Sequence, residues 1–131
     1  GENVHVAAWP GSVRNTQDIT RFMAREGRSY VLSASAIMRR EWLDDALPGA
    51  ELMKGHDEDW ITDGGSCIAG PDGEWILEPQ SCTAGVFSAE IDLDAVFRER
   101  QNFDPAGHYS RPDITRLEVN RERQSTVSFK D

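Results

Sequence analysis

The stretch GGSCIAGPDGEW, residues 64–75, decides the fold of this chain. The runs SCIAG and EWILEP flank the turn sequence Pro-Asp-Gly, and this order predicts a β-hairpin. Asp72-Gly73 supplies a tight turn in which Gly73 can take positive φ, because glycine has no Cβ. The sequence therefore predicts at least one antiparallel pair of strands.

Cys67 lies inside this stretch, and its position raises the question whether the thiol is a catalytic nucleophile. Cysteine catalysis needs a base within reach and a group that stabilises the developing negative charge. No such partner is near Cys67 in the sequence, and a small buried cysteine is common in a strand that leads to a hairpin. We therefore expect Cys67 to be structural, and we expect the same of Cys82 in the polar connection PQSCTAG.

Strand and helix patterns alternate on both sides of the hairpin. Before the hairpin we expect a strand around Val4, Val6 and the following alanine pair, ended by Pro10-Gly11, then a helix that Asn15 or Thr16 caps and Gly27 ends, and then a strand over 29–37. After the hairpin we expect a strand over AGVFSAEI, 84–91, and a helix that Asp92 caps, with Leu93, Val96 and Phe97 on one apolar face. One or two strands are expected within 115–129. Residues 39–63 are irregular and charged and are expected to form a long surface loop. This order predicts a mixed α/β layered fold.

Composition bounds the class of protein. The chain has 131 residues, the size of one domain, and a net charge of −9, so a nucleic-acid backbone would be repelled. No apolar run approaches the roughly 20 residues that cross a bilayer, so no membrane contact is expected. Two cysteines without a metal-site spacing favour a reducing compartment, with the cytoplasm as the default. The chain starts without methionine or a signal-peptide pattern, which indicates a piece of something longer.

The histidines and lysines offer little further chemistry. The run His56 to Asp59 lacks the alternation of a calcium loop and is expected to be a solvated loop, so no metal site is expected. His5 is expected to be a hydrogen-bonded histidine on a strand, and neither of the only lysines, Lys54 and Lys130, is placed as a buried catalytic group. The segment FDPAGHYSRPD, which contains His108, predicts an ordered loop, either a fixed chain crossing or an interface or site. From these residues alone the sequence indicates a mixed α/β domain without a recognisable active site.

Five segments together resemble the C-terminal part of a nitrilase of the carbon-nitrogen hydrolase superfamily. They are VHVAAWPG, RFMAREGRSYVLSAS, DGGSCIAGPDGEWILEP, AEIDLDAV and RQNFDPAGHYSRPD, in the order that family uses. The resemblance implies that residues 1–131 are the C-terminal portion of a single domain, without separate domains, and part of a four-layer α-β-β-α sandwich. It also implies an enzyme that converts nitriles into carboxylic acids and ammonia.

The family's catalytic set is Glu, Lys and Cys, and in the family's order it lies upstream of VHVAAWPG. No residue of this chain therefore inherits a catalytic role, and the chain alone is expected to be inactive. The resemblance implies covalent cysteine chemistry without a metal or organic cofactor. Trp9 and Pro10 follow a strand next to the one that would carry the nucleophile, so they are candidates for the wall of a nitrile pocket, with core filling as the alternative for Trp9.

The resemblance further implies a homo-oligomer, in which His108 and Arg111 are candidates for bonding a neighbouring subunit. A sandwich that lacks its other sheet exposes apolar faces and strand edges, so the chain alone is expected to be poorly stable and to self-associate. Two alternatives remain open. The chain could be a non-catalytic assembly or partner module, or the complete enzyme could be a related cyanide hydratase or amidase.

Overall fold

The computed structural model describes residues 1–54, 59–104, 106–127 and 129. Within these residues the chain forms five strands, three α-helices and one short 3-10 helix. They follow the chain in the order β1 (Val4–Trp9), α1 (Val13–Gly27), β2 (Tyr30–Ser35), β3 (Ile37–Arg39), η1 (Arg40–Trp42), α2 (Ala50–Lys54), β4 (Trp60–Ala69), β5 (Trp75–Ser81) and α3 (Leu93–Asn102). The predicted α/β class with a mixed sheet is confirmed.

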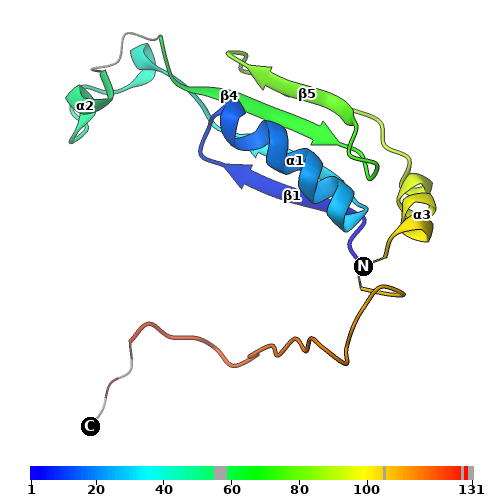
Figure 1. Ribbon diagram of the computed structural model, residues 1–131. Coiled ribbons are helices and arrows are strands. Elements are labelled where there is room, and N and C mark those ends of the chain that lie inside the picture. Colours follow the sequence, from blue (N-terminus) through cyan, green and yellow to red (C-terminus); the bar gives the residue numbers. More distant parts are fainter. Residues whose placement is uncertain (55–58, 105, 128, 130–131) are drawn as a thin grey trace.

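The described strands form one mixed sheet of five strands (Figure 1). β1 and β2 run parallel, in register from the pair Val4 and Tyr30 to the pair Trp9 and Ser35. β4 runs antiparallel to β2, β3 and β5. The connection between the parallel strands is α1, which is the crossover that a β-α-β unit requires.

The hairpin predicted over residues 64–75 is confirmed. β4 and β5 pair around a turn in which Gly73 has φ 82° and its backbone N–H donates to the Gly70 carbonyl over 2.8 Å. The Glu74 carbonyl accepts from the N–H of Gly70 over 2.8 Å, which closes the turn. β4 is longer than predicted, because it begins at Trp60 inside the segment expected to be a loop.

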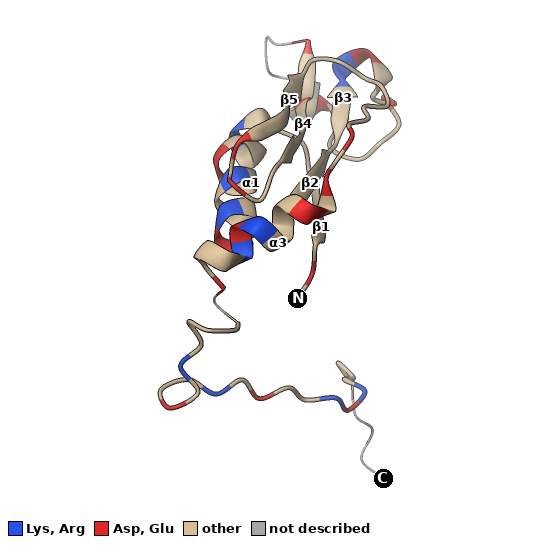
Figure 2. Cartoon of the chain, turned by 90° about the vertical axis from the view of Figure 1, so that its right-hand side faces the viewer, with Lys and Arg blue, Asp and Glu red and all other residues tan. Residues whose placement is uncertain are grey.

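α1 covers one face of the sheet (Figure 1). The side chains that meet beneath it are small: Ala24 on α1, Val31 on β2 and Ala69 on β4 are at most 1% exposed. Met23 and Trp75 pack around this cluster. Charged side chains gather on α1 and α3, whereas the strands are largely uncharged (Figure 2).

The predicted cap of α1 is wrong by about one turn. Ser12 caps the helix, because its backbone is extended, with φ −173°, and its side chain accepts from the N–H of Arg14 over 3.2 Å. Thr16 is instead a fully buried helical residue whose hydroxyl donates to the Val13 carbonyl over 3.2 Å. The predicted end at Gly27 is confirmed, and Arg28 follows it in the left-handed conformation, with φ 49°.

α3 is capped by Asp92, as predicted, and lies at the end of the sheet where β1 begins (Figure 1). The Tyr30 hydroxyl donates to the Asp92 carbonyl over 2.9 Å and accepts from its N–H over 3.2 Å. The predicted apolar face is only partly buried: Val96 is fully buried, whereas Leu93 and Phe97 are 45% and 53% exposed.

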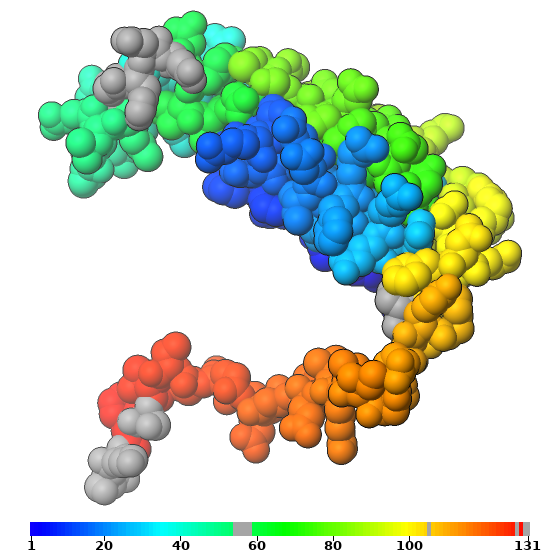
Figure 3. All heavy atoms as spheres, viewed as in Figure 1, coloured from blue at the N-terminus to red at the C-terminus, as the bar shows by residue number. Residues whose placement is uncertain are grey.

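The strands predicted over 84–91 and 115–129 are wrong for the residues that the structure describes there. A strand needs a neighbouring backbone to hydrogen-bond, and these segments have none beside them. Val86 and Leu117 are 98% and 87% exposed. The chain after α3 runs away from the body as an extended tail (Figure 3).

The prediction of a long loop over 39–63 is also wrong in part. The segment holds η1, α2 and the first residues of β4, and Arg39 ends β3. The backbone N–H of Arg40 donates to the Asp59 carbonyl over 3.0 Å, which ties the beginning of η1 to the start of β4. The run His56 to Glu58 lies outside the described residues, so the prediction of a solvated loop stays a prediction there.

Candidate functional site

The end of β1 and the loop that follows it carry the two residues predicted to line a pocket. Trp9 is the last residue of β1 and Pro10 follows it. Because β1 and β2 are parallel, both end at the same edge of the sheet, on the side away from α3 (Figure 1). Ligands of open α/β sheets bind outside the carboxyl ends of the strands, so this edge is the expected place for a site.

Trp9 is half-buried and held at two points. Its indole N–H donates to the Ser33 hydroxyl on β2 over 3.1 Å, and its backbone carbonyl accepts from the N–H of Ala36 over 3.1 Å. Pro10 is exposed. The structure thus places Trp9 partly in the fold and Pro10 at the surface, and whether either lines a substrate pocket stays a prediction.

The rest of this loop is fixed by close packing and by a carboxylate. Gly11 has φ 118°, and a Cβ placed there would lie 2.4 Å from the Ala36 carbonyl oxygen and 2.7 Å from Thr62 Cβ. Asp63 accepts from the N–H of Val13 over 3.2 Å, at the start of α1. We call residues 9–13 the Trp9 loop, and these contacts hold it in one conformation.

Cys67 is buried, at 1% exposure, and its thiol donates to the Thr20 hydroxyl over 3.5 Å. Burial raises the pKa of the Cys67 thiol, and hydrogen bonds from Thr20, Thr16 and Ser33 offset this only in part. A thiol with a raised pKa stays protonated near neutral pH and is a poor nucleophile. The geometry therefore supports the structural interpretation of Cys67.

Cys82 is exposed and follows β5 with a positive φ of 53°. Its Sγ accepts from the Ser81 hydroxyl over 3.5 Å, and its backbone N–H donates to the Asp63 carbonyl over 2.7 Å. These contacts place Cys82 in the turn after β5, and none of the partners that the structure describes for it would activate a thiol.

The predicted interface residues, His108 and Arg111, lie in the tail that follows α3 (Figure 3). The His108 ring lies 4.6 Å from that of Tyr109, which in turn lies 5.1 Å from that of Phe103. Arg111 donates to both carboxylate oxygens of Asp113, over 2.8 and 2.6 Å, and this pairing raises the pKa of Arg111 and lowers that of Asp113. Both His108 and Arg111 are exposed, and their role between subunits stays a prediction.

His5 is hydrogen-bonded, as predicted, through Nδ1 to Glu2 Oε1 over 3.0 Å. In the described part of the chain no group of three or more His, Cys, Asp or Glu side chains could hold a metal ion. In the same residues no helix has both the length and the apolar character needed to cross a bilayer.

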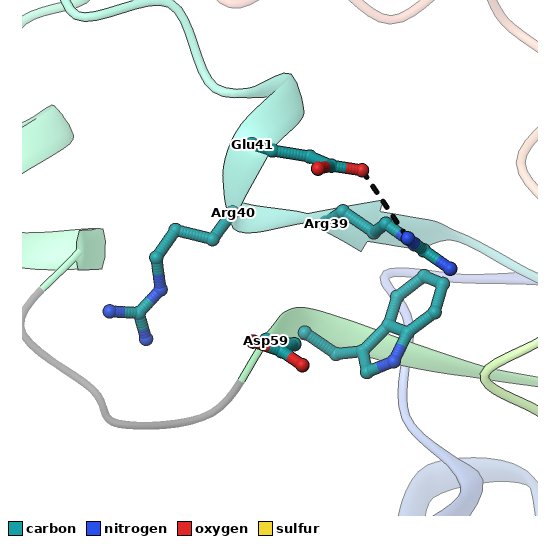
Figure 4. A pocket seen from close by; sticks show the side chains of 5 residues that line it. Arg39, Arg40, Glu41 and Asp59 are labelled. Carbon is teal, nitrogen blue, oxygen red and sulfur yellow. Dashed lines mark hydrogen bonds and ion pairs between the residues drawn. The ribbon is translucent and has the colours of Figure 1, made fainter.

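A pocket of about 520 Å³, which was not predicted from the sequence, lies where β3 and η1 meet the start of β4 (Figure 4). Arg39 stacks on the ring of Trp60, at 4.5 Å from its centroid, and donates to Glu41 over 3.3 Å. The rings of Trp60 and Trp42 meet edge to face at 6.0 Å. The pocket is lined by Arg39, Arg40, Glu41, Asp59 and Trp60. The available sequence signal was Trp42, which closely follows Arg39 and Arg40, but Trp60 is 18 residues further along in a segment expected to be a loop.

No protein-family model matches the chain. Individual proteins named nitrilases do match the chain. An aliphatic nitrilase from Rhodococcus rhodochrous is 31% identical over 139 residues, covering 98% of this chain and 36% of the relative. An arylacetonitrilase from Aspergillus kawachii is 34% identical over 148 residues, covering 97% of this chain and 44% of the relative.

The chain belongs to the nitrilase family. A third nitrilase, from an unknown prokaryotic organism, is 34% identical over 134 residues and covers all of this chain. The chain spans 36–44% of the length of these nitrilases, in keeping with the C-terminal part that the sequence motifs indicated. Their names differ in substrate, aliphatic for one and arylacetonitrile for another, so family membership leaves the nitrile class open.

Proposed function

We propose that this chain is the C-terminal portion of an enzyme that hydrolyses nitriles to carboxylic acids and ammonia. The observation that carries the proposal is the match of proteins named nitrilases along nearly the whole chain, at 31–34% identity. Among the described residues neither cysteine has the setting of a nucleophile, because Cys67 is buried with a raised pKa and Cys82 has no activating partner there. This fits a catalytic Glu, Lys and Cys set that lies upstream of residue 1.

The proposed reaction is covalent catalysis with general acid-base help. The upstream cysteine thiolate attacks the nitrile carbon, a glutamate moves protons, and a lysine stabilises the tetrahedral species. The attack gives a thioimidate, and one water adds to it to form the tetrahedral species. This species expels ammonia and leaves a thioester, which a second water hydrolyses to release the acid and the free thiol. No metal or organic cofactor takes part, and the chain alone is inactive.

In the proposed enzyme, this chain supplies a wall of the site. Trp9 and Pro10 stand at the carboxyl end of β1, and an indole there offers an apolar surface to a nitrile. The Trp9 loop is held by Ala36, Asp63 and Ser33, which suits a surface that must keep its shape during turnover.

The proposal also includes a second sheet on the open face of this one, and an oligomer of the complete enzyme. The face of the sheet opposite α1 has an apolar groove of about 340 Å³, lined by residues that include Val6, Leu32, Ile68 and Leu77. Val6 is 69% exposed there. A second sheet and its helices, packed on this face, would complete a four-layer α-β-β-α sandwich. The complete enzyme is proposed to be a cytoplasmic homo-oligomer in which His108 and Arg111 contact a neighbouring subunit.

The test is ammonia release by the full-length protein over a panel of aliphatic, aromatic and arylacetonitriles. Release from nitriles, with the matching carboxylic acid as product, supports the proposal. Release from amides alone would contradict it in favour of an amidase. Conversion of cyanide to formamide without acid would favour a cyanide hydratase.

A non-catalytic assembly or partner module is the second candidate. The observation that favours it is the same lack of an activated nucleophile among the described residues. The coding sequence ahead of Gly1 separates the two candidates. A Cys-Trp-Glu-type element there supports the enzyme, and a start codon directly at this position supports the module.

A further inference from the structure

We propose that Ser33 is a positioning residue that holds the indole of Trp9 in one orientation for substrate binding. The inference rests on the proposed nitrilase function, because it assigns the Trp9 side chain to the substrate pocket. It concerns a residue of β2 that is 3% exposed and contacts Thr20 of α1.

The contact itself joins two neighbouring parallel strands. The Trp9 indole N–H donates to Ser33 Oγ over 3.1 Å, and the side chain of Ser33 is 3% exposed. An indole N–H can only donate, so the half-buried ring takes the orientation that points this N–H at an available acceptor. On this side of the sheet Ser33 Oγ is that acceptor.

Ser33 is itself fixed by a second buried contact. Its hydroxyl lies 2.6 Å from that of Thr20, which is fully buried on α1, and the Cys67 thiol donates to the same Thr20 oxygen over 3.5 Å. The three hydroxyl and thiol groups come from α1, β2 and β4, so the acceptor for Trp9 is anchored to three elements. Hydrogen bonds that form a buried network polarise and support one another.

This arrangement gives Ser33 a role that a core-filling serine would lack. A serine buried only for packing needs one partner for its hydroxyl, and Thr20 already supplies it. The additional bond to Trp9 reaches out to the carboxyl edge of the sheet, where the Trp9 loop lies. Loss of the Ser33 hydroxyl therefore leaves the β-strand pairing intact and releases the indole.

The experiment is a double-mutant cycle in the full-length protein, with the variants S33A, W9F and S33A/W9F. W9F removes the indole donor and keeps the buried pair of Ser33 and Thr20. The first readout is kcat and KM for an aromatic nitrile. The second is the hydrogen-exchange rate of the Trp9 indole N–H, whose NMR signal is assigned because it is missing in W9F. Ser35→Ala is the matched control, because Ser35 lies on the same strand as Ser33 and its hydroxyl donates to the Gly64 carbonyl of β4 over 2.5 Å.

We expect S33A to raise KM about fivefold, the size of one neutral hydrogen bond, with kcat changed less than about twofold. In the W9F background S33A should have no further effect on KM. Exchange of the indole N–H should be about tenfold faster in S33A and unchanged in S35A. An equal KM effect of S33A with and without the indole would overturn the proposal, as would an unchanged KM and an unchanged exchange rate.

The two readouts separate the failure of this proposal from that of the proposed function. If the full-length protein hydrolyses no nitrile, the proposed function fails, and the exchange rate alone decides whether Ser33 holds the indole. If nitriles are hydrolysed and S33A leaves both readouts unchanged, only the positioning role fails. If S33A does not fold, W9F alone decides: an unchanged KM in W9F overturns the proposal.

Discussion

Replacing Gly11 with alanine tests whether the Trp9 loop is packed as tightly as the structure indicates. Gly11 has φ 118°, and an added Cβ would lie 2.4 Å from the Ala36 carbonyl oxygen and 2.7 Å from Thr62 Cβ. Both neighbours belong to the sheet region, and the nearer one is a backbone atom, so neither can rotate away. The loop or the strands must move.

Two effects add to the loss of stability. A residue with a Cβ held at such a φ costs about 1–3 kcal/mol, and forcing an extra carbon into packed structure costs about 1–3 kcal/mol more. We therefore expect G11A to lower the free energy of unfolding by about 3 kcal/mol. Gly49 is the matched control, because it has a positive φ of 85° but nothing within 4 Å of the added Cβ. G49A should lower the free energy of unfolding by only about 1 kcal/mol.

The assay is urea unfolding of the full-length protein and the two variants, monitored by tryptophan fluorescence. The three curves are fitted with one common slope of the free energy of unfolding against urea concentration. The difference in the free energy of unfolding between G11A and G49A measures the close approach of the added Cβ to Ala36 and Thr62, because both variants carry the backbone strain of a positive φ. If G11A is no more destabilising than G49A, the contacts of the loop with Ala36 and Thr62 are not those described above. Nitrile turnover in G11A should fall with stability, since the displaced loop carries Trp9.

The remaining predictions concern the cysteines, the tail and the isolated chain. Iodoacetamide at pH 8 should modify the exposed Cys82 much faster than Cys67, because Cys67 is buried and burial raises the pKa of its thiol, which lowers its thiolate fraction. Peptide mass spectrometry measures both rates, and faster labelling of Cys67 would refute the structural assignment. Replacing Cys67 with alanine in the full-length protein should leave most of the activity, and complete loss with the fold intact would restore Cys67 as a catalytic candidate. The double variant H108A/R111A should reduce the oligomer size seen by light scattering, and an unchanged size would remove these residues from the interface. The isolated 131-residue chain should self-associate and unfold broadly, because Val6 is 69% exposed on the open face; a sharp, reversible transition from a strict monomer would contradict this.

The elements that the sequence predicted well are those that local residues specify. Asp72-Gly73 fixes a turn whatever surrounds it, and an aspartate at position 92 caps a helix through its own side chain, over 3.0 Å to the N–H of Asp94. The buried state of Cys67 also followed from its place in the strand. In each case the deciding contacts lie within a few residues.

The errors concern elements whose formation depends on distant or absent partners. Leu117 and Val119 alternate with charged and polar neighbours as in a strand, but the described tail has no strand beside it to pair with. Asn15, Thr16 and Ser12 are all cap residues, and the choice of Ser12 depends on Asp63, which bonds Val13 from 50 residues away. The pocket at Arg39 needed the pairing of β3 with β4, and the bond from Trp9 to Ser33 needed the register of β1 and β2.

The N-terminal residues and the end of α3 meet at one corner of the molecule (Figure 1). Arg100 donates to the side chain of Asn3 over 3.0 Å and to the Glu2 carbonyl, and Arg28 pairs with Glu99 over 3.0 Å. The chain therefore enters and leaves its folded part at the same place. For protein engineering, residues 1–102 form a cassette whose two junctions are neighbours in space. In a chimaera with a relative of different nitrile preference, both junctions lie at this corner, and the apolar face that carries Val6 must also match the sheet proposed to pack on it.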